Sequence, residues 1–368
     1  SNNGSNSVFG GSVAQGVVAA RLPNPDLKWE TTTEINVGID YGLLNNRISG
    51  SIDFFKRKTS DQLFNKPLPS VVGFTNVRTN LGEVENRGVD LNLNAILINK
   101  DDFQWSTGIT MSFLKNEVTM LPDFTEEIIG GNIGTFIRQY TIVREGAPLQ
   151  SFYGYEIDGI FQVGDDIANS ATPDYLPGQP RFVDQDGDGD VDADDRVVLG
   201  DPFPDFSFGF NNNFKYKNLS LEIFLQGVQG IESLDANVTE SLYPTNSARN
   251  SISKYYNERW TPENPSNTLP SGENPSQYGG ARAINSLTIT DASFIRLKNI
   301  TLGYNIPLKD TFRITSLGLY AAVDNLFTIT DFEGYDPDAS AEGTNVERSS
   351  YNSYPLARTI RLGLDIKF

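Results

Sequence analysis

Aspartates dominate the segment 184–195 of this chain, and six of them fall at the ligand positions of a calcium-binding loop. In an EF-hand loop, positions 1, 3, 5, 9 and 12 supply side-chain oxygens, position 7 supplies a backbone carbonyl and position 6 is glycine. Gly189 stands at the sixth position here. Crowded carboxylates repel one another unless a cation neutralises them. The pattern predicts a calcium site whose ligands are Asp184, Asp186, Asp188, Asp190, Asp192 and Asp195.

The loop departs from the EF-hand pattern in two ways. Asp195 replaces the usual glutamate at position 12, which shortens the reach of a bidentate ligand, and no flanking helices are evident. Calcium loops of the dockerin kind also end in aspartate, so this change does not exclude the ion. The alternative is a solvated acidic loop without a metal. We expect calcium in a structural role that stiffens a long connection.

The composition removes most catalytic chemistry. The chain has no histidine and no cysteine, which excludes histidine-based triads, histidine-ligated zinc, thiolate sites and disulfides. Carboxylate pairs of the glycosidase type occur mainly in the acidic loop, where metal binding explains them better. We therefore predict no catalytic residues and no enzyme activity. A formal net charge of -18 argues against nucleic acid as a partner.

Apolar and polar residues alternate along about eleven segments, as expected for strands with one apolar and one polar face. In the last segment, Ile360, Leu362, Leu364, Ile366 and Phe368 share a face. The phase changes near residues 298–299, which predicts a β-bulge. The segments are 34–43, 47–54, 89–97, 105–113, 133–143, 153–161, 206–216, 219–225, 294–306, 317–323 and 358–368.

The connections between these segments alternate between tight turns and long loops, such as 58–80 and 229–293. This rhythm is typical of bacterial outer-membrane barrels, which have short periplasmic turns and long extracellular loops. No apolar run approaches the ~20 residues of a membrane helix. The predicted fold is all-β, an antiparallel transmembrane β-barrel. A soluble β-sandwich is the alternative, although it gives no reason to place every long loop at one end.

A sheet of about eleven strands would leave open edges in lipid, and bacterial single-chain barrels have even strand numbers. Eleven strands are half of a barrel of about 22 strands. We therefore expect the carboxy-terminal half of a larger barrel. Residues 1–33 would be a loop and lead-in from the missing half, and residues 34–368 would be the barrel, with the calcium loop inserted at 184–195. Because the first residues lack signal-peptide features, either the protein is cytoplasmic or this is not its natural beginning.

Several segments together resemble the SusC/RagA family of TonB-dependent transporters. They are NPDLKWETTTEINVGID (24–40), NLGEVENRGVDL (80–91), SFYGYEIDGIF (151–161), DASFIRLKNITLGYNIP (291–307), DNLFTIT (324–330) and YPLARTIRLGLDIKF (354–368). The resemblance implies a barrel of about 22 strands in the outer membrane, an amino-terminal plug and energy from TonB. It also implies a SusD-like surface lipoprotein as partner and import of oligosaccharides, or sometimes peptides. The plug and the TonB box are absent from this chain.

Aromatic residues in the long connections are weak candidates for substrate contact. Their rings could stack on sugars, pack one loop against another or meet the partner lipoprotein. They are Trp260, Tyr243, Tyr278, Tyr335 and Tyr351. The resulting hypothesis is the barrel component of a nutrient importer, and the alternative is a secreted, soluble, β-rich glycan-binding or adhesin module. The two differ in the outward strand faces, which should stay apolar only in the barrel.

Overall fold

A computed structural model describes most of the chain. The described residues are 6–9, 12–15, 22–74, 76–122, 125–133, 137–242, 250–272, 284–308, 314–338 and 349–367. Two of the aromatic candidates, Tyr243 and Tyr278, lie outside these residues, as does Phe368. Among the described residues, no helix is both long and apolar enough to span a membrane.

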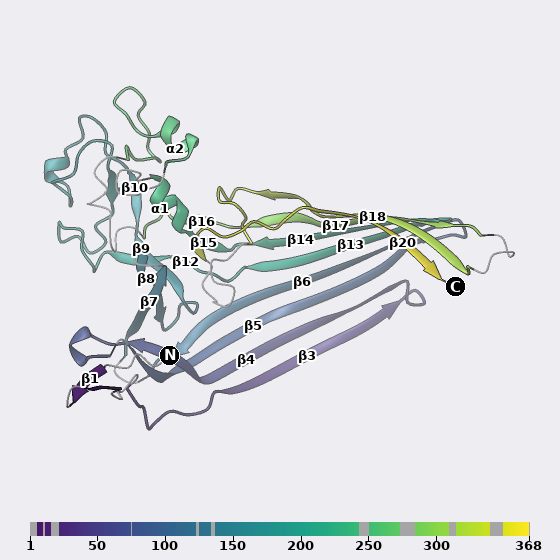
Figure 1. Cartoon of the computed structure of the whole chain (residues 1–368), viewed down its shortest axis with the longest axis horizontal. Coiled ribbons are helices and arrows are strands. Elements are labelled where there is room, and N and C mark those ends of the chain that lie inside the picture. The colour runs from purple at the N-terminus through teal and green to yellow at the C-terminus, as the bar shows by residue number, and fades with distance from the viewer. Residues whose placement is uncertain are drawn as a thin grey trace.

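A long, antiparallel, nine-stranded sheet dominates the described part of the chain (Figure 1). Each strand pairs with the next sheet strand along the chain, so that β3 and β20 form the two edges. In chain order the strands are β3 (Thr31–Leu43), β4 (Ile48–Pro67), β5 (Asn76–Asn99), β6 (Phe103–Met120), β13 (Phe206–Tyr216), β14 (Leu219–Gln229), β17 (Phe294–Ile306), β18 (Ser316–Thr330) and β20 (Thr359–Lys367). The antiparallel fold expected from the alternation is confirmed, and the sheet is not closed within the described part.

The sheet has nine strands among the described residues rather than about eleven. The segments predicted at 133–143 and 153–161 contribute to a separate sheet, ordered β12-β9-β8-β7. Its strands are β7 (Glu127–Ile133), β8 (Ile137–Arg144), β9 (Ser151–Tyr155) and β12 (Arg196–Gly200). All five residues of β9 are buried. A strand buried on both faces cannot present one face to lipid, so its place is among the connections.

The connection predicted at 58–80 is also shorter than expected. Strand β4 continues to Pro67 and β5 begins at Asn76, which leaves only residues 68–75 between them. The apolar alternation fades at Phe54 because Lys56 and Lys58 occupy the following positions on the same face, yet the backbone ladder continues. Strand pairing therefore extends beyond the apolar part of the sheet.

The remaining elements gather with the second sheet at one end of the long sheet, opposite the tight turns and the carboxy terminus (Figure 1). Within the segment expected to be loop and lead-in, β1 and β2 form a hairpin. The helical segments are short. These elements are β1 (Asn6–Phe9), β2 (Ser12–Gln15), η1 (Ser70–Val72), β10 (Ile157–Ile160), η2 (Ile167–Asn169), β11 (Pro180–Phe182), β15 (Glu232–Asp235), α1 (Ala236–Leu242), α2 (Ser253–Glu258), β16 (Ile289–Asp291) and β19 (Ser349–Ser350).

The two faces of the long sheet differ in chemistry. The register aligns one apolar row across six neighbouring strands, which consists of Trp105, Phe214, Leu221, Leu302, Ala321 and Leu362. On the edge strand β20, Leu362 is 82% exposed. The opposite face carries polar residues such as Asp53, Asp90 and Ser112, again directly opposite one another. This is the arrangement of a barrel wall with lipid outside and a polar interior.

The length of the apolar face matches a membrane. On β6 the outward positions from Phe103 to Phe113 are apolar except for Thr107. About ten steps of ~3.4 Å, tilted by about 40°, give a height of about 25 Å. The predicted bulge is present as well, because the register shifts between Leu297 and Asn299.

Candidate functional site

The acidic loop connects two strands at the loop-bearing end of the molecule. It leaves β11, which pairs with β10, and enters β12 in the second sheet. Val191, the one large apolar residue among the aspartates, is 1% exposed and packs in a cluster with Tyr155, Tyr175 and Phe182. This anchor was missed in the sequence, although a lone valine at the eighth position of an acidic loop was a usable signal.

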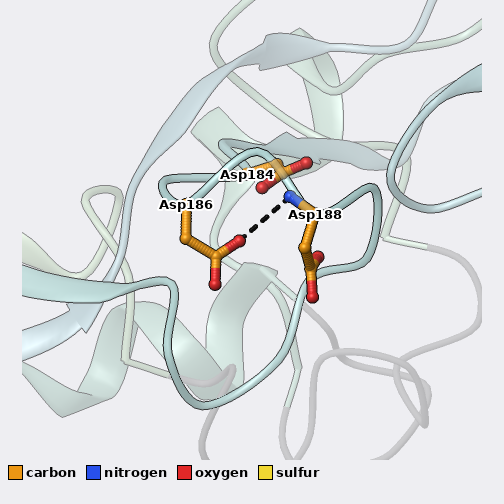
Figure 2. A group of neighbouring side chains, drawn as sticks. All are labelled: Asp184, Asp186 and Asp188. Carbon is orange, nitrogen blue, oxygen red and sulfur yellow. Dashed lines mark hydrogen bonds between the residues drawn. The ribbon is translucent and has the colours of Figure 1, made fainter.

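Three of the predicted ligands converge. Oxygen atoms of Asp184, Asp186 and Asp188 lie within 4.8 Å of one another (Figure 2). The backbone turns sharply between them, with φ of +78° at Gly187 and +92° at Gly189, a region that favours glycine. Both glycine N–H groups donate to Asp184, over 2.6 Å and 2.9 Å, and so fix its carboxylate.

The other three predicted ligands lie outside this trio and bond to the loop itself. The Asp190 and Asp192 side chains accept hydrogen bonds from the N–H groups of Val191 and Asp194, each over 2.8 Å. Asp195 is 1% exposed and accepts from the N–H groups of Gln185 and Asp192, each over 2.7 Å. Asp195 therefore joins the two ends of the loop.

The electrostatics of the trio fit a divalent cation. The N–H of Asp188 donates to Asp186 and lowers its pKa, but desolvation and the carboxylates of Asp188, Asp195 and Asp184 outweigh this bond, so the pKa of Asp186 is raised. An all-oxygen, carboxylate-rich donor set of this kind is the one that calcium prefers. The residues present thus fit a calcium ion.

A buried cation follows the acidic loop directly. Arg196 is 7% exposed, its Nη2 donates to the backbone carbonyls of Gln139 and Tyr153, and its guanidinium lies 4.4 Å from the centroid of the Tyr153 ring. These contacts fasten the end of the acidic loop to strands β8 and β9.

A second buried cation ties the connection between β18 and β20 to the long sheet. Arg296 on β17 is 1% exposed, and its Nη2 lies 2.5 Å from Oδ1 of Asp336. Its Nε donates to Thr328 Oγ1 on β18 over 2.9 Å, and its Nη1 lies 3.5 Å from Asp338 Oδ2. Nothing in the local sequence indicated this pair.

The protonation of Asp336 responds to these contacts. Burial raises its pKa, but the N–H groups of Leu356 and Asp338 and the guanidinium of Arg296 outweigh burial, so the pKa is lowered. A carboxyl whose folded pKa is depressed stabilises the fold above its unfolded pKa of about 4. That contribution is lost as the pH falls through the lower, folded value.

The three described aromatic candidates differ in exposure. Trp260 is 7% exposed, donates from Nε1 to Gln162 over 2.8 Å and leaves no room for a side chain at Gly178. Tyr351 packs against a buried cluster that includes Phe152. Both therefore fit the expected alternative of loop packing. Tyr335 is 71% exposed and is free to contact another molecule.

These features and the comparison with known proteins agree on the family. The family model described as "TonB dependent receptor-like, beta-barrel" matches residues 2–326. The chain belongs to this family of outer-membrane proteins. The resemblance to the SusC/RagA type of TonB-dependent receptor is thereby confirmed, together with the outer-membrane location.

Individual relatives extend over almost the whole chain. TonB-dependent receptor P3 of Formosa agariphila is 38% identical over 98% of this chain and 36% of its own length. TonB-dependent receptor SusC of Bacteroides thetaiotaomicron is 31% identical over 94% of this chain and 32% of its own length. A solved structure of the RagAB peptide transporter superposes with a TM-score of 0.78 at 25% identity, covering 99% of this chain and 38% of that one. The chain thus spans about a third of the length of each of these relatives.

Proposed function

We propose that this chain forms part of the barrel wall of a TonB-dependent importer of the SusC/RagA type. The observation that carries the proposal is the outward apolar face of the long sheet, about 25 Å tall, backed by a polar inner face. Such a wall separates lipid from a polar passage. A secreted, soluble module would not expose Ile35, Val37 and Ile39 at 63–65% along one strand face.

The partners follow from the same proposal. TonB would act through a plug and TonB box that lie outside this chain, and a SusD-like surface lipoprotein would cover the loop-bearing end. The exposed ring of Tyr335 is at that end and is available for this contact. We propose oligosaccharides as the substrate class. Peptides are the second candidate, favoured by the likeness to the RagAB peptide transporter.

Uptake by whole cells tests this function. Cells expressing the complete receptor and its lipoprotein would be given labelled oligosaccharide mixtures or labelled peptide mixtures, with functional or inactivated TonB. We expect TonB-dependent accumulation of oligosaccharides. Accumulation of peptides alone would select the second candidate. If neither class accumulated above the level of cells lacking the receptor, the import function would be wrong.

We also propose that the acidic loop binds calcium and so stiffens the connection between β11 and β12. Support comes from the convergence of Asp184, Asp186 and Asp188 and from the two anchors that follow them, Val191 in the core and Arg196 in the second sheet. A bound cation would remove the repulsion within the trio. The proposed role is structural, since both anchors join the loop to packed parts of the fold.

Replacing Asp184 and Asp188 together with asparagine should lower the calcium affinity at least about tenfold, because calcium loops are tuned by the charge of their ligands. Isothermal titration of the complete receptor with calcium measures this affinity. Asp194→Asn is the matched control, since Asp194 lies in the same loop at a position that is not a ligand. Equal loss in the control, or no calcium binding by the unmodified receptor at millimolar concentration, would contradict the site.

A further inference from the structure

The outward face of β4, β5 and β6 changes from apolar to charged between one cross-strand row of residues and the next. The last apolar row of this face consists of Phe54, Val89 and Phe113, directly opposite one another. Two residues nearer the long connections, the next row consists of Lys56, Arg87 and Lys115, again directly opposite one another. We call these three residues the cation row.

Three like charges side by side are unfavourable in a sheet unless something neutralises them. Two carboxylates do so in part. Glu85 lies 2.9 Å from Lys56 and 3.7 Å from Arg87, and Glu117 lies 3.6 Å from Arg87 and 3.9 Å from Lys115. Both acids stand one row beyond the cation row, on the side away from the apolar face. The cation row therefore keeps an excess of positive charge toward the apolar face.

The exposure of the side chains also indicates that the cations of this row are available to a ligand. The side chains of Lys56, Arg87 and Lys115 are 55%, 50% and 64% exposed, whereas Glu85 and Glu117 are 13% and 32% exposed. A fourth cation on this face, Lys58, is matched by Glu83 over 2.6 Å. The cations are thus more exposed than the acids with which they pair.

Over β6, the inner face of the sheet is covered at this level. On the inner face, Val118 is 0% exposed and packs with Val143 and Leu149, and Asn116 accepts a hydrogen bond from the Leu149 N–H over 2.7 Å. Strand β8 and its neighbours thus cover the inner face of β6. Because the cation row lies on the outward face, a ligand must reach it from the membrane side.

The cation row stands where hydrocarbon gives way to lipid headgroups. The apolar face ends at Phe113, and the row follows at the end of the sheet that carries the long connections. Strands lie about 4.8 Å apart, so the row is about 10 Å wide. We propose that the cation row binds phosphate groups of lipid headgroups in the outer leaflet. Charge-assisted hydrogen bonds from lysine and arginine to phosphate oxygens would supply the missing negative charge.

Titration of the complete receptor, purified in a neutral detergent, with lipid A tests this assignment. Each cation near an anionic lipid surface is worth about fivefold in affinity, so K56Q/R87Q/K115Q should bind about 100-fold more weakly than the unmodified receptor. The matched control K100Q/K217Q/K367Q removes three charges at the opposite end of the sheet and should leave the affinity unchanged. The conservative variant K56R/K115R should retain binding.

Folding is checked separately through the heat-modifiable mobility of each variant. The proposal is wrong if the folded cation-row variant binds lipid A as tightly as the unmodified receptor, or if the control loses as much. Displacement of lipid A by millimolar inorganic phosphate would also overturn it, since the row would then be a site for free anions. None of these outcomes depends on transport, so the proposed import function is tested independently.

Discussion

Replacing Arg296 with alanine is expected to destabilise the complete receptor by about 3–5 kcal/mol, the usual cost of removing one partner from a buried ion pair. Asp336 is 5% exposed, and the substitution would leave its carboxylate buried beside an empty space. The hydrogen bond to Thr328 and the contact with Asp338 would be lost as well. Denaturant unfolding in lipid bilayers measures the free energy of unfolding.

A second ion pair provides the matched control. Arg361 on β20 lies 2.8 Å from Asp324 on β18, but its side chain is 55% exposed. Exposed pairs contribute about 0–1 kcal/mol, so Arg361→Ala should have a small effect. If both variants lost a similar amount of unfolding free energy, burial would not govern the strength of the Arg296 contact. If R296A lost less than about 1 kcal/mol, Arg296 would not anchor the connection between β18 and β20.

Placing a positive charge at Ile223 should cost about 2–4 kcal/mol, because this residue faces outward near the middle of the apolar face of β14. Its neighbours in the same row are Asn212, Ile300 and Val323. An arginine there would have to lie in hydrocarbon or bend toward the headgroups. The yield of heat-modifiable barrel and the free energy of unfolding both report the effect of I223R.

The inner face supplies the control for this substitution. Asn213 lies on the adjacent strand β13, directly opposite Glu222, whose carboxylate can pair with a new cation. Asn213→Arg should therefore be tolerated, with a change below about 1 kcal/mol. If N213R destabilised the barrel as much as I223R, the assignment of the two faces would be incorrect.

Local patterns in the sequence predicted the features that depend on local chemistry. Alternation defined the two faces of the strands in the apolar part of the long sheet, and the phase change located the bulge between Leu297 and Asn299. The tight turn between the segments 34–43 and 47–54 contains Asn45 and Asn46, and asparagine tolerates the positive φ that both residues adopt there. The spacing of the aspartates predicted Asp184, Asp186 and Asp188 as ligands of one site, and their side chains do converge.

Features that depend on the third dimension were not predicted. The ends of β4 and β5 were missed because the apolar alternation stops where the outward face becomes charged, although the backbone ladder continues to Pro67. The second sheet was mistaken for barrel strands because alternation does not say whether the polar face is also covered. Arg296 and Asp336 are far apart in sequence and come together only in the folded chain.

Cysteine scanning of residues 219–225 on β14 tests the central claim, that this sheet is a membrane wall, most directly. The chain contains no cysteine, so each substitution in this segment is unique within it. Fluorescent labels at Leu219, Leu221, Ile223 and Leu225 should be quenched by a lipid-soluble nitroxide, and labels at the three intervening residues should not. Quenching that fails to alternate, or its absence at all seven positions, would contradict the account.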